Sequence, residues 1–153
     1  MSHWYNAVVS DMSQIVGCIN EFEDELMEAR GDVKLKGSLE RQSAALPAVT
    51  EIRFSQLQEI EAILEHLNIE LRKERSMVFR KYLETYNRQL SSREADKYVD
   101  GEKSVIDLTH LVNRFSLIRN RYLGILKGLE AKSFQINNIT KLRTVGMEDI
   151  VIG

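Results

Sequence analysis

The chain has 153 residues, of which 43% are hydrophobic and 29% charged, and its formal net charge is -2. This is the length of one ordinary domain, and a net charge so near zero argues against a strongly basic, nucleic-acid-coating protein. Eight glycines and one proline are too few for a flexible or proline-rich linker, and one cysteine excludes an internal disulfide. No apolar stretch approaches the roughly 18 residues of a membrane span, so we expect no membrane partner.

The first part of the chain, residues 1–46, is predicted to be an acidic helical region. Between residues 4 and 27, apolar side chains recur at steps of three and four, which predicts one amphipathic helix. Gly31 and Gly37 bracket the predicted connection that follows, and Ser38 is the predicted N-cap of a short segment that ends at Leu46.

Residues 47–90 are predicted to form a long helix with a basic second half. Pro47 fits the first turn of this helix, where its missing N–H costs nothing, and the following residues to about Leu90 contain neither Gly nor Pro. A helix of about 40 residues would be about 60 Å long, which is more than the diameter of a compact domain of this size. Such helices usually belong to coiled coils or extended bundles.

Residues 91–146 are predicted to form the C-terminal helices. Ser91 and Glu94 make a capping box, Asp100-Gly101 is a break, and apolar steps of three and four predict a helix from Glu102 to about Ala131. Ser133 is the predicted cap of a final short helix. The predicted fold is therefore a single all-α domain with two or three long helices plus short ones, bundle-like or coiled-coil-like, that forms an oligomer.

Charge is distributed unevenly along the sequence. Residues 1–70 hold five Lys+Arg and 13 Asp+Glu, whereas residues 71–153 hold 16 and ten. This asymmetry favours an acidic half that faces protein and a basic half that faces a polyanion.

A tract in the basic half is typical of phosphate binding, because each cation placed on a phosphate releases counterions. Its cations are opposed only by Glu74 and are Arg72, Lys73, Arg75, Arg80 and Lys81. Phe79, Tyr82 and Tyr86 lie among them, and aromatic faces beside a basic groove stack the bases of single strands. The alternative is a solvated helix face in which Tyr82 and Tyr86 belong to the core.

Motifs that carry chemistry are missing. The sequence has no phosphate-cradling glycine loop, no nucleophile elbow and no zinc motif, and Asp107 with His110 is interpreted as a surface polar pair. We therefore expect neither enzymatic activity nor a cofactor or metal.

The second half, about residues 72–146, resembles the UvsY-type recombination mediator proteins of tailed phages. Three segments carry the resemblance, and the last is the most specific because a basic-small-Phe-x-Ile spacing recurs near the C-terminus of that family. The segments are Phe79 to Tyr86 (FRKYLETY), Glu94 to Tyr98 (EADKY) and Tyr122 to Ile139 (YLGILKGLEAKSFQINNI). The family's basic-Phe stretch has no match at Arg143-Thr144-Val145-Gly146, and residues 1–46 have no counterpart in the family.

The resemblance implies a helical homo-oligomer, ring-forming in that family, that binds single-stranded DNA. Its expected partners are a RecA-like recombinase and the single-strand-binding protein that the recombinase displaces. The expected location is the cytoplasm, that of an infected host cell for a phage protein.

Two sets of site residues follow. Arg80 and Lys81 match the family's basic DNA-contact motif, and charge clustering adds further residues. The complete predicted nucleic-acid-binding set is Arg72, Lys73, Arg75, Arg80, Lys81, Tyr86 and Arg88. Segment 133–143 matches the family's oligomerisation region, for which the predicted contacts are Phe134, Ile136, Ile139 and Leu142.

A second hypothesis remains open. A helical coiled-coil adaptor or structural protein would assemble by pairing its basic half with the acidic half of a neighbouring subunit. The uneven charge allows this equally well.

Overall fold

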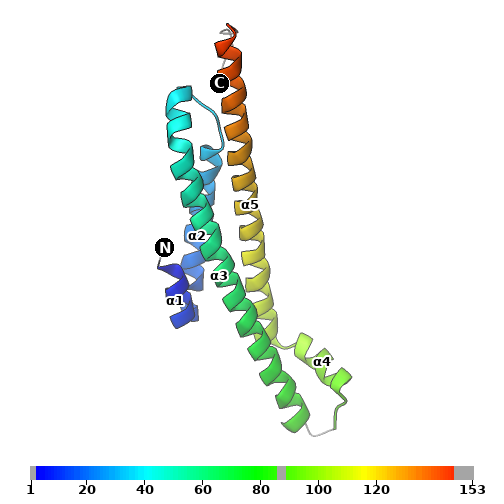
Figure 1. The fold of residues 1–153 in the computed structure, drawn as a ribbon. Coiled ribbons are helices and arrows are strands. Elements are labelled where there is room, and N and C mark those ends of the chain that lie inside the picture. The colour runs from blue at the N-terminus through cyan, green and yellow to red at the C-terminus, as the bar shows by residue number, and fades with distance from the viewer. Residues whose placement is uncertain (1–2, 86–88, 147–153) are drawn as a thin grey trace. The chain divides into compact units, whose positions relative to one another are not determined.

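The computed structural model describes residues 3–85 and 89–146, and the described chain is all-α, as predicted (Figure 1). No strand occurs in these two ranges. The α-helices are α1 Trp4–Ser10, α2 Ile15–Asp32, α3 Leu39–Thr85, α4 Ser92–Asp100 and α5 Lys103–Thr144. None of the described helices has the length and apolarity that a membrane span requires.

The chain divides into two compact units, and α3 and α5 contribute to both. Unit 1 comprises Met1–Ile60 and Ile118–Gly153, and unit 2 comprises Glu61–Leu117. Unit 1 therefore contains α1, α2, the first part of α3 and the last part of α5. Unit 2 contains the rest of α3, α4 and the beginning of α5.

The prediction of one helix over residues 4–27 is wrong, because the chain breaks at Asp11. This residue has an extended backbone, with φ -152° and ψ 106°, and a 3-10 turn at Met12–Gln14 separates α1 from α2. The Asp11 carboxylate accepts hydrogen bonds from the backbone N–H of Ser13 at 3.0 Å and from its hydroxyl at 2.8 Å. A short polar side chain that bonds its own local backbone competes with the helix, and this outweighs the apolar periodicity.

The long helix α3 begins earlier than predicted. Pro47 lies inside it, at the ninth position, rather than at its start. The missing N–H of Pro47 removes the bond to the carbonyl of Ser43, and both residues are exposed, so water can reach that carbonyl. The predicted cap at Ser38 is confirmed, because its hydroxyl accepts from the backbone N–H of Arg41 at 3.4 Å.

The prediction that Ser133 caps a separate helix is also wrong, since α5 runs unbroken to Thr144. Buried Leu129 and Ile136, seven residues apart, continue the apolar stripe across this position. The cap at Ser91 is confirmed instead, because its hydroxyl accepts from the N–H of Glu94 at 3.2 Å.

The core of unit 1 lies between α2, α3 and α5 and contains a buried cation. Arg53 of α3 is 7% exposed. Its guanidinium donates to Glu25 at 2.8 Å and to Asp32 at 2.8 Å, and Gln56 donates to Glu25 at 3.0 Å. A buried charge is tolerated only when it is paired and hydrogen-bonded, and here two α2 carboxylates meet that need.

α5 joins this core through two long-range hydrogen bonds. The Lys132 ammonium donates to the backbone carbonyl of Asp32 at 2.6 Å, and the Tyr122 hydroxyl donates to the carbonyl of Phe22 at 3.0 Å. Burial lowers the pKa of Lys132 and raises the pKa of Tyr122. Both contacts hold α5 against the backbone of α2.

Gly128 allows α5 to approach the α2–α3 connection, and this predicts the effect of a methyl group there. A Cβ at Gly128 would lie 2.8 Å from a Val33 methyl carbon, whereas a Cβ at Gly124 of the same helix would meet nothing within 4 Å. Gly128→Ala should lower the free energy of unfolding by about 1 to 3 kcal/mol through overpacking. Gly124→Ala should instead raise it by about 0.5 to 1 kcal/mol. Urea denaturation of both variants is the measurement, and equal effects would contradict the packing.

The Arg53 cluster predicts a pH dependence. Hydrogen bonds from Gln56 and Arg53 hold the pKa of Glu25 below its ordinary 4.5. A depressed carboxyl pKa contributes stability above about pH 4.5 that is lost as the pH falls through the folded-state value. Arg53→Met should remove about 1 to 3 kcal/mol at pH 7, less than for a fully buried pair because both carboxylates are about one third exposed. The substitution should also make the free energy of unfolding fall less steeply as the pH decreases.

Denaturant titrations at several pH values between 7 and 3 measure both effects. Arg41→Met, which replaces an exposed arginine of the same helix, is the control. Parallel curves for the wild type and Arg53→Met would show that the cluster does not contribute to the acid sensitivity.

Candidate nucleic-acid interface

In unit 2, the basic part of α3 packs against α4 and the start of α5 through a small apolar core. Val78 of α3, Val99 of α4 and Val105 of α5 are each no more than 5% exposed, and Phe79 and Tyr82 pack against them. These contacts fix which face of α3 is turned inward. The opposite face carries three of the predicted DNA-binding cations, Arg72, Lys73 and Arg80.

The aromatic residues of the tract are used in packing. The Tyr82 ring stacks on Tyr98 with centroids 5.2 Å apart, and its hydroxyl donates to Glu102 at 2.8 Å. Phe79 is half-buried against the valine cluster. Tyr82 is therefore half-buried and packs against the core of unit 2, which supports the interpretation of this ring as a packing residue. Tyr86, the third aromatic residue, lies outside the described residues, as does Arg88.

Four of the predicted cations lie beside carboxylates. Arg75 is 2.9 Å from Asp100, and Lys81 is 3.6 Å from Glu102, so these pairs join α3 to the end of α4 and to the residue before α5. Along α3 itself, Arg72 is 3.6 Å from Glu65 and Lys73 is 3.2 Å from Glu70. Arg80 has no ion pair with any residue that the structure describes.

The charge imbalance between the two halves of the sequence does not appear as an imbalance between the two compact units. Residues 61–117, the whole of unit 2, hold ten Lys+Arg and ten Asp+Glu. The division into an acidic and a basic half along the sequence therefore does not correspond to a division between the compact units. The basic tract of α3 shares its unit with an equal number of acidic residues.

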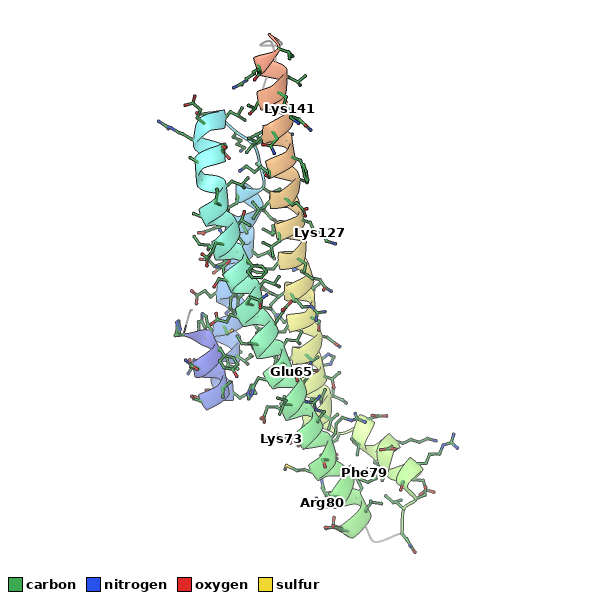
Figure 2. All side chains as sticks on the ribbon, in the orientation of Figure 1. Glu65, Lys73, Phe79, Arg80, Lys127 and Lys141 are labelled. Carbon is green, nitrogen blue, oxygen red and sulfur yellow. The ribbon has the colours of Figure 1, made fainter. Side chains whose placement is uncertain are left out.

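A local basic face nevertheless remains on α3. Arg72, Ser76 and Arg80 are four residues apart and so lie on one side of the helix, and all three are exposed. Lys73 lies beside this row, and Figure 2 shows Lys73 and Arg80 projecting from α3. The ion pair between Arg72 and Glu65 has both partners more than 60% exposed, and such pairs are worth about 0 to 1 kcal/mol. A phosphate can therefore replace the carboxylate at little cost.

The predicted oligomerisation residues lie on α5 in unit 1, but not on one face. Phe134 is 63% exposed and Leu142 is 39% exposed. Ile139 is half-buried, and Ile136 is 5% exposed. The side chain of Ile136 is therefore already packed within its own subunit, and Phe134 is the residue most available to a second molecule.

The cations near the C-terminus belong to none of the sites predicted from the sequence. Residues 118–146 hold six Lys+Arg and only Glu130 as an acid. Four of these cations are exposed on α5, and none has an ion pair within the part of the chain that the structure describes: Arg121, Lys127, Lys141 and Arg143. The excess of basic over acidic residues in this segment is the sequence pattern that could have identified these four cations.

Within residues 3–85 and 89–146, no three His, Cys, Asp or Glu side chains come together in a group that could hold a metal ion. Comparison with protein-family models, curated proteins and solved structures finds no match to this chain.

Proposed function

We propose that this protein binds single-stranded DNA through the exposed face of α3 in unit 2 and acts as a recombination mediator. In this role it loads a RecA-like recombinase onto a strand held by a single-strand-binding protein, in phage DNA recombination and repair. The observation that carries the DNA binding is the exposed row Arg72–Ser76–Arg80 with Lys73 beside it. The mediator role rests on the resemblance of residues 72–146 to the UvsY-type proteins.

The proposed binding is electrostatic and independent of sequence. Arg72 and Arg80 are eight residues apart, which is about 12 Å along the helix, so they contact different phosphates. Each contact releases condensed counterions, and the affinity falls as salt rises. The packed rings of Phe79 and Tyr82 leave little aromatic surface for stacking, so affinity comes mainly from the backbone of the strand.

The adaptor hypothesis remains the alternative, and exposed apolar side chains in unit 1 favour it. Phe54 and Phe134 are 51% and 63% exposed, so an isolated subunit leaves two large apolar rings in contact with water. An adaptor built on charge-complementary halves would dissociate at high salt and show no DNA affinity. Measurement of mass and of single-strand binding at low and high salt separates the two functions.

The proposed face predicts the salt dependence of binding. Arg72→Ala/Arg80→Ala should weaken single-strand binding by about 10- to 100-fold at about 50 mM salt. It should reduce the slope of log affinity against log salt by about 1.4, because each phosphate contact on a single strand contributes about 0.7. Fluorescence anisotropy with a labelled oligonucleotide over a salt series is the measurement.

The matched control is Arg30→Ala/Arg41→Ala, which removes the same charge from exposed positions of unit 1. An equal loss in the control would show that net charge alone sets the affinity. Absence of wild-type binding at about 50 mM salt would overturn the proposed function.

The ion pairs between α3 and its neighbours predict a gain of affinity. Asp100→Asn/Glu102→Gln removes the carboxylates beside Arg75 and Lys81 but keeps side-chain shape and hydrogen bonding. Single-strand affinity should rise by about 3- to 10-fold at about 50 mM salt as these cations become available to phosphates. Asp107→Asn, whose partner is Lys103 at 2.7 Å, is the control in the same unit. A similar rise in the control would contradict a role for Arg75 and Lys81.

A further inference from the structure

A small pocket lies between α3 and α4 in unit 2, beside the proposed DNA-binding face. Its volume is about 270 Å³, and it is lined by Arg75, Ser76 and Phe79 of α3 and by Asp96 and Val99 of α4. Figure 2 shows Phe79 on the side of α3 that is turned toward α4. Pockets for drug-sized ligands have volumes of about 300 to 1,000 Å³, so this pocket suits a smaller group.

The pocket has an aromatic wall and polar groups at its edge. Phe79 is half-buried against the valine cluster, so its ring is held in place while part of it remains accessible. Asp96 and Ser76 are exposed, and neither has a hydrogen bond or an ion pair with any described residue. Arg75 donates to Asp100 at 2.9 Å, and a guanidinium has further N–H donors. The pocket therefore offers a ring face, an acceptor and several donors.

The pocket lies next to the cations that are proposed to hold phosphates. Ser76 is midway between Arg72 and Arg80 on the exposed row of α3, and it also lines the pocket. A strand whose phosphates contact both arginines therefore passes the edge of the pocket. The Asp96 carboxylate repels a phosphate but not a neutral base, so a base is the part of the strand that fits here.

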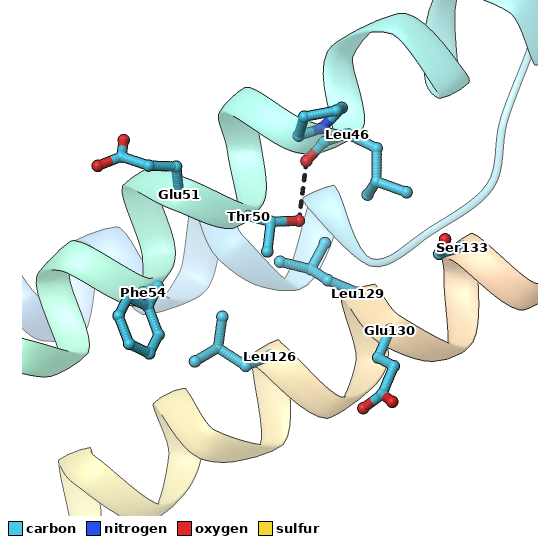
Figure 3. Close-up of a pocket in the computed structure, with 9 residues that line it drawn as sticks. Leu46, Thr50, Glu51, Phe54, Leu126, Leu129, Glu130 and Ser133 are labelled. Carbon is cyan, nitrogen blue, oxygen red and sulfur yellow. Dashed lines mark hydrogen bonds between the residues drawn. The ribbon is translucent and has the colours of Figure 1, made fainter.

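The larger hollow of unit 1 does not fit the same ligand. It lies between α3 and α5, has a volume of about 680 Å³ and is shown in Figure 3. The residues that line it include Glu51 and Glu130 but neither a lysine nor an arginine. A strand of DNA would meet only negative charge among these lining residues. The pocket of unit 2 is therefore the better candidate for a nucleotide.

We propose that the pocket of unit 2 takes one unpaired base of the bound strand and prefers cytosine to uracil or thymine. The base lies against the Phe79 ring, and the Asp96 carboxylate accepts a hydrogen bond from its 4-amino group. Arg75 and Ser76 donate to the acceptors N3 and O2. Uracil and thymine carry a carbonyl oxygen in place of the amino group, and this oxygen is repelled by the carboxylate. The inference rests on the proposed function and adds one base contact to phosphate contacts that are independent of sequence.

Such a contact selects single strands over duplexes. In a duplex the amino group of cytosine is paired and its ring is stacked on both sides, so the base can enter a pocket only after it is unpaired. Stacking on an aromatic ring contributes to the affinity for every base, because each base has a π face. The acceptor of Asp96 then adds the discrimination between bases.

Asp96→Asn tests the base preference. The strands are oligo-dC and oligo-dU of equal length, whose bases have the same ring size and differ at N3 and position 4. The wild type should bind oligo-dC about 5- to 10-fold more tightly at about 50 mM salt. The variant should bind both strands with similar affinity, because an amide accepts from an amino group and donates to a carbonyl. Fluorescence anisotropy with labelled strands is the measurement.

The matched control is Asp107→Asn, which removes the same charge from an exposed position of unit 2 that does not line the pocket. It should keep the wild-type preference. Asp96 is exposed, so helicity by circular dichroism should be unchanged in its variant. A preference for oligo-dC that Asp96→Asn retains overturns the role of this carboxylate.

Phe79→Leu tests the aromatic wall. Leucine keeps apolar contact with the valine cluster but removes the ring face, so the affinity for both strands should fall by about 3- to 10-fold. The slope of log affinity against log salt should not change, because no phosphate contact is lost. The melting temperature and circular dichroism check that the variant is folded. Unchanged affinity in a folded variant overturns the proposed stacking.

The same titrations separate this inference from the proposed function. Equal wild-type affinity for oligo-dC and oligo-dU, with binding that weakens as salt rises, overturns the base pocket and leaves the phosphate contacts intact. Binding of neither strand overturns the proposed function itself. A preference for oligo-dC that is lost in Asp96→Asn and kept in Asp107→Asn supports both.

Discussion

The arrangement of unit 1 depends on one residue, Asp32, which contacts the other two helices of its core. Its carboxylate accepts from Arg53 of α3, and its backbone carbonyl accepts from Lys132 of α5. Both donors are buried, so a shift of either helix along its axis would leave a buried cation without its partner, which costs several kcal/mol. These contacts fix the register of α3 against α5, which brings Phe54 and Leu126 to the same pocket.

Folding also decides which charges face outward. In unit 2 the apolar contacts of Val78 turn one side of α3 toward α4 and the start of α5, where Asp100 and Glu102 meet Arg75 and Lys81. The cations on the opposite side have partners only on α3 itself or, for Arg80, none among the described residues. The same basic tract thus contains two kinds of cation, and only one kind is readily available to a phosphate.

The fold class and the helix caps at Ser38 and Ser91 could be predicted from the sequence, because apolar periodicity and capping depend on neighbours within a few residues. The helix boundaries at Asp11, Pro47 and Ser133 could not. At Asp11 a local side-chain hydrogen bond interrupts a helix that the apolar periodicity predicts. At Pro47 and Ser133 the helix and its apolar stripe continue through residues that usually mark a helix boundary. The pairing of the basic tract depends on residues 20 to 25 positions away, which no local pattern reveals.

The small number of cations on the proposed α3 face limits the affinity of one copy for a strand. One α3 face offers few phosphate contacts, and a single strand bound by so few cations dissociates readily at physiological salt. A strand that is held by several copies of the chain meets several such faces at once. Linking several weak faces turns the later contacts into intramolecular ones, which raises avidity by orders of magnitude without any new contact to DNA. Because unit 2 holds as many acidic as basic residues, the strength of the proposed DNA binding depends on how many α3 faces act on one strand together.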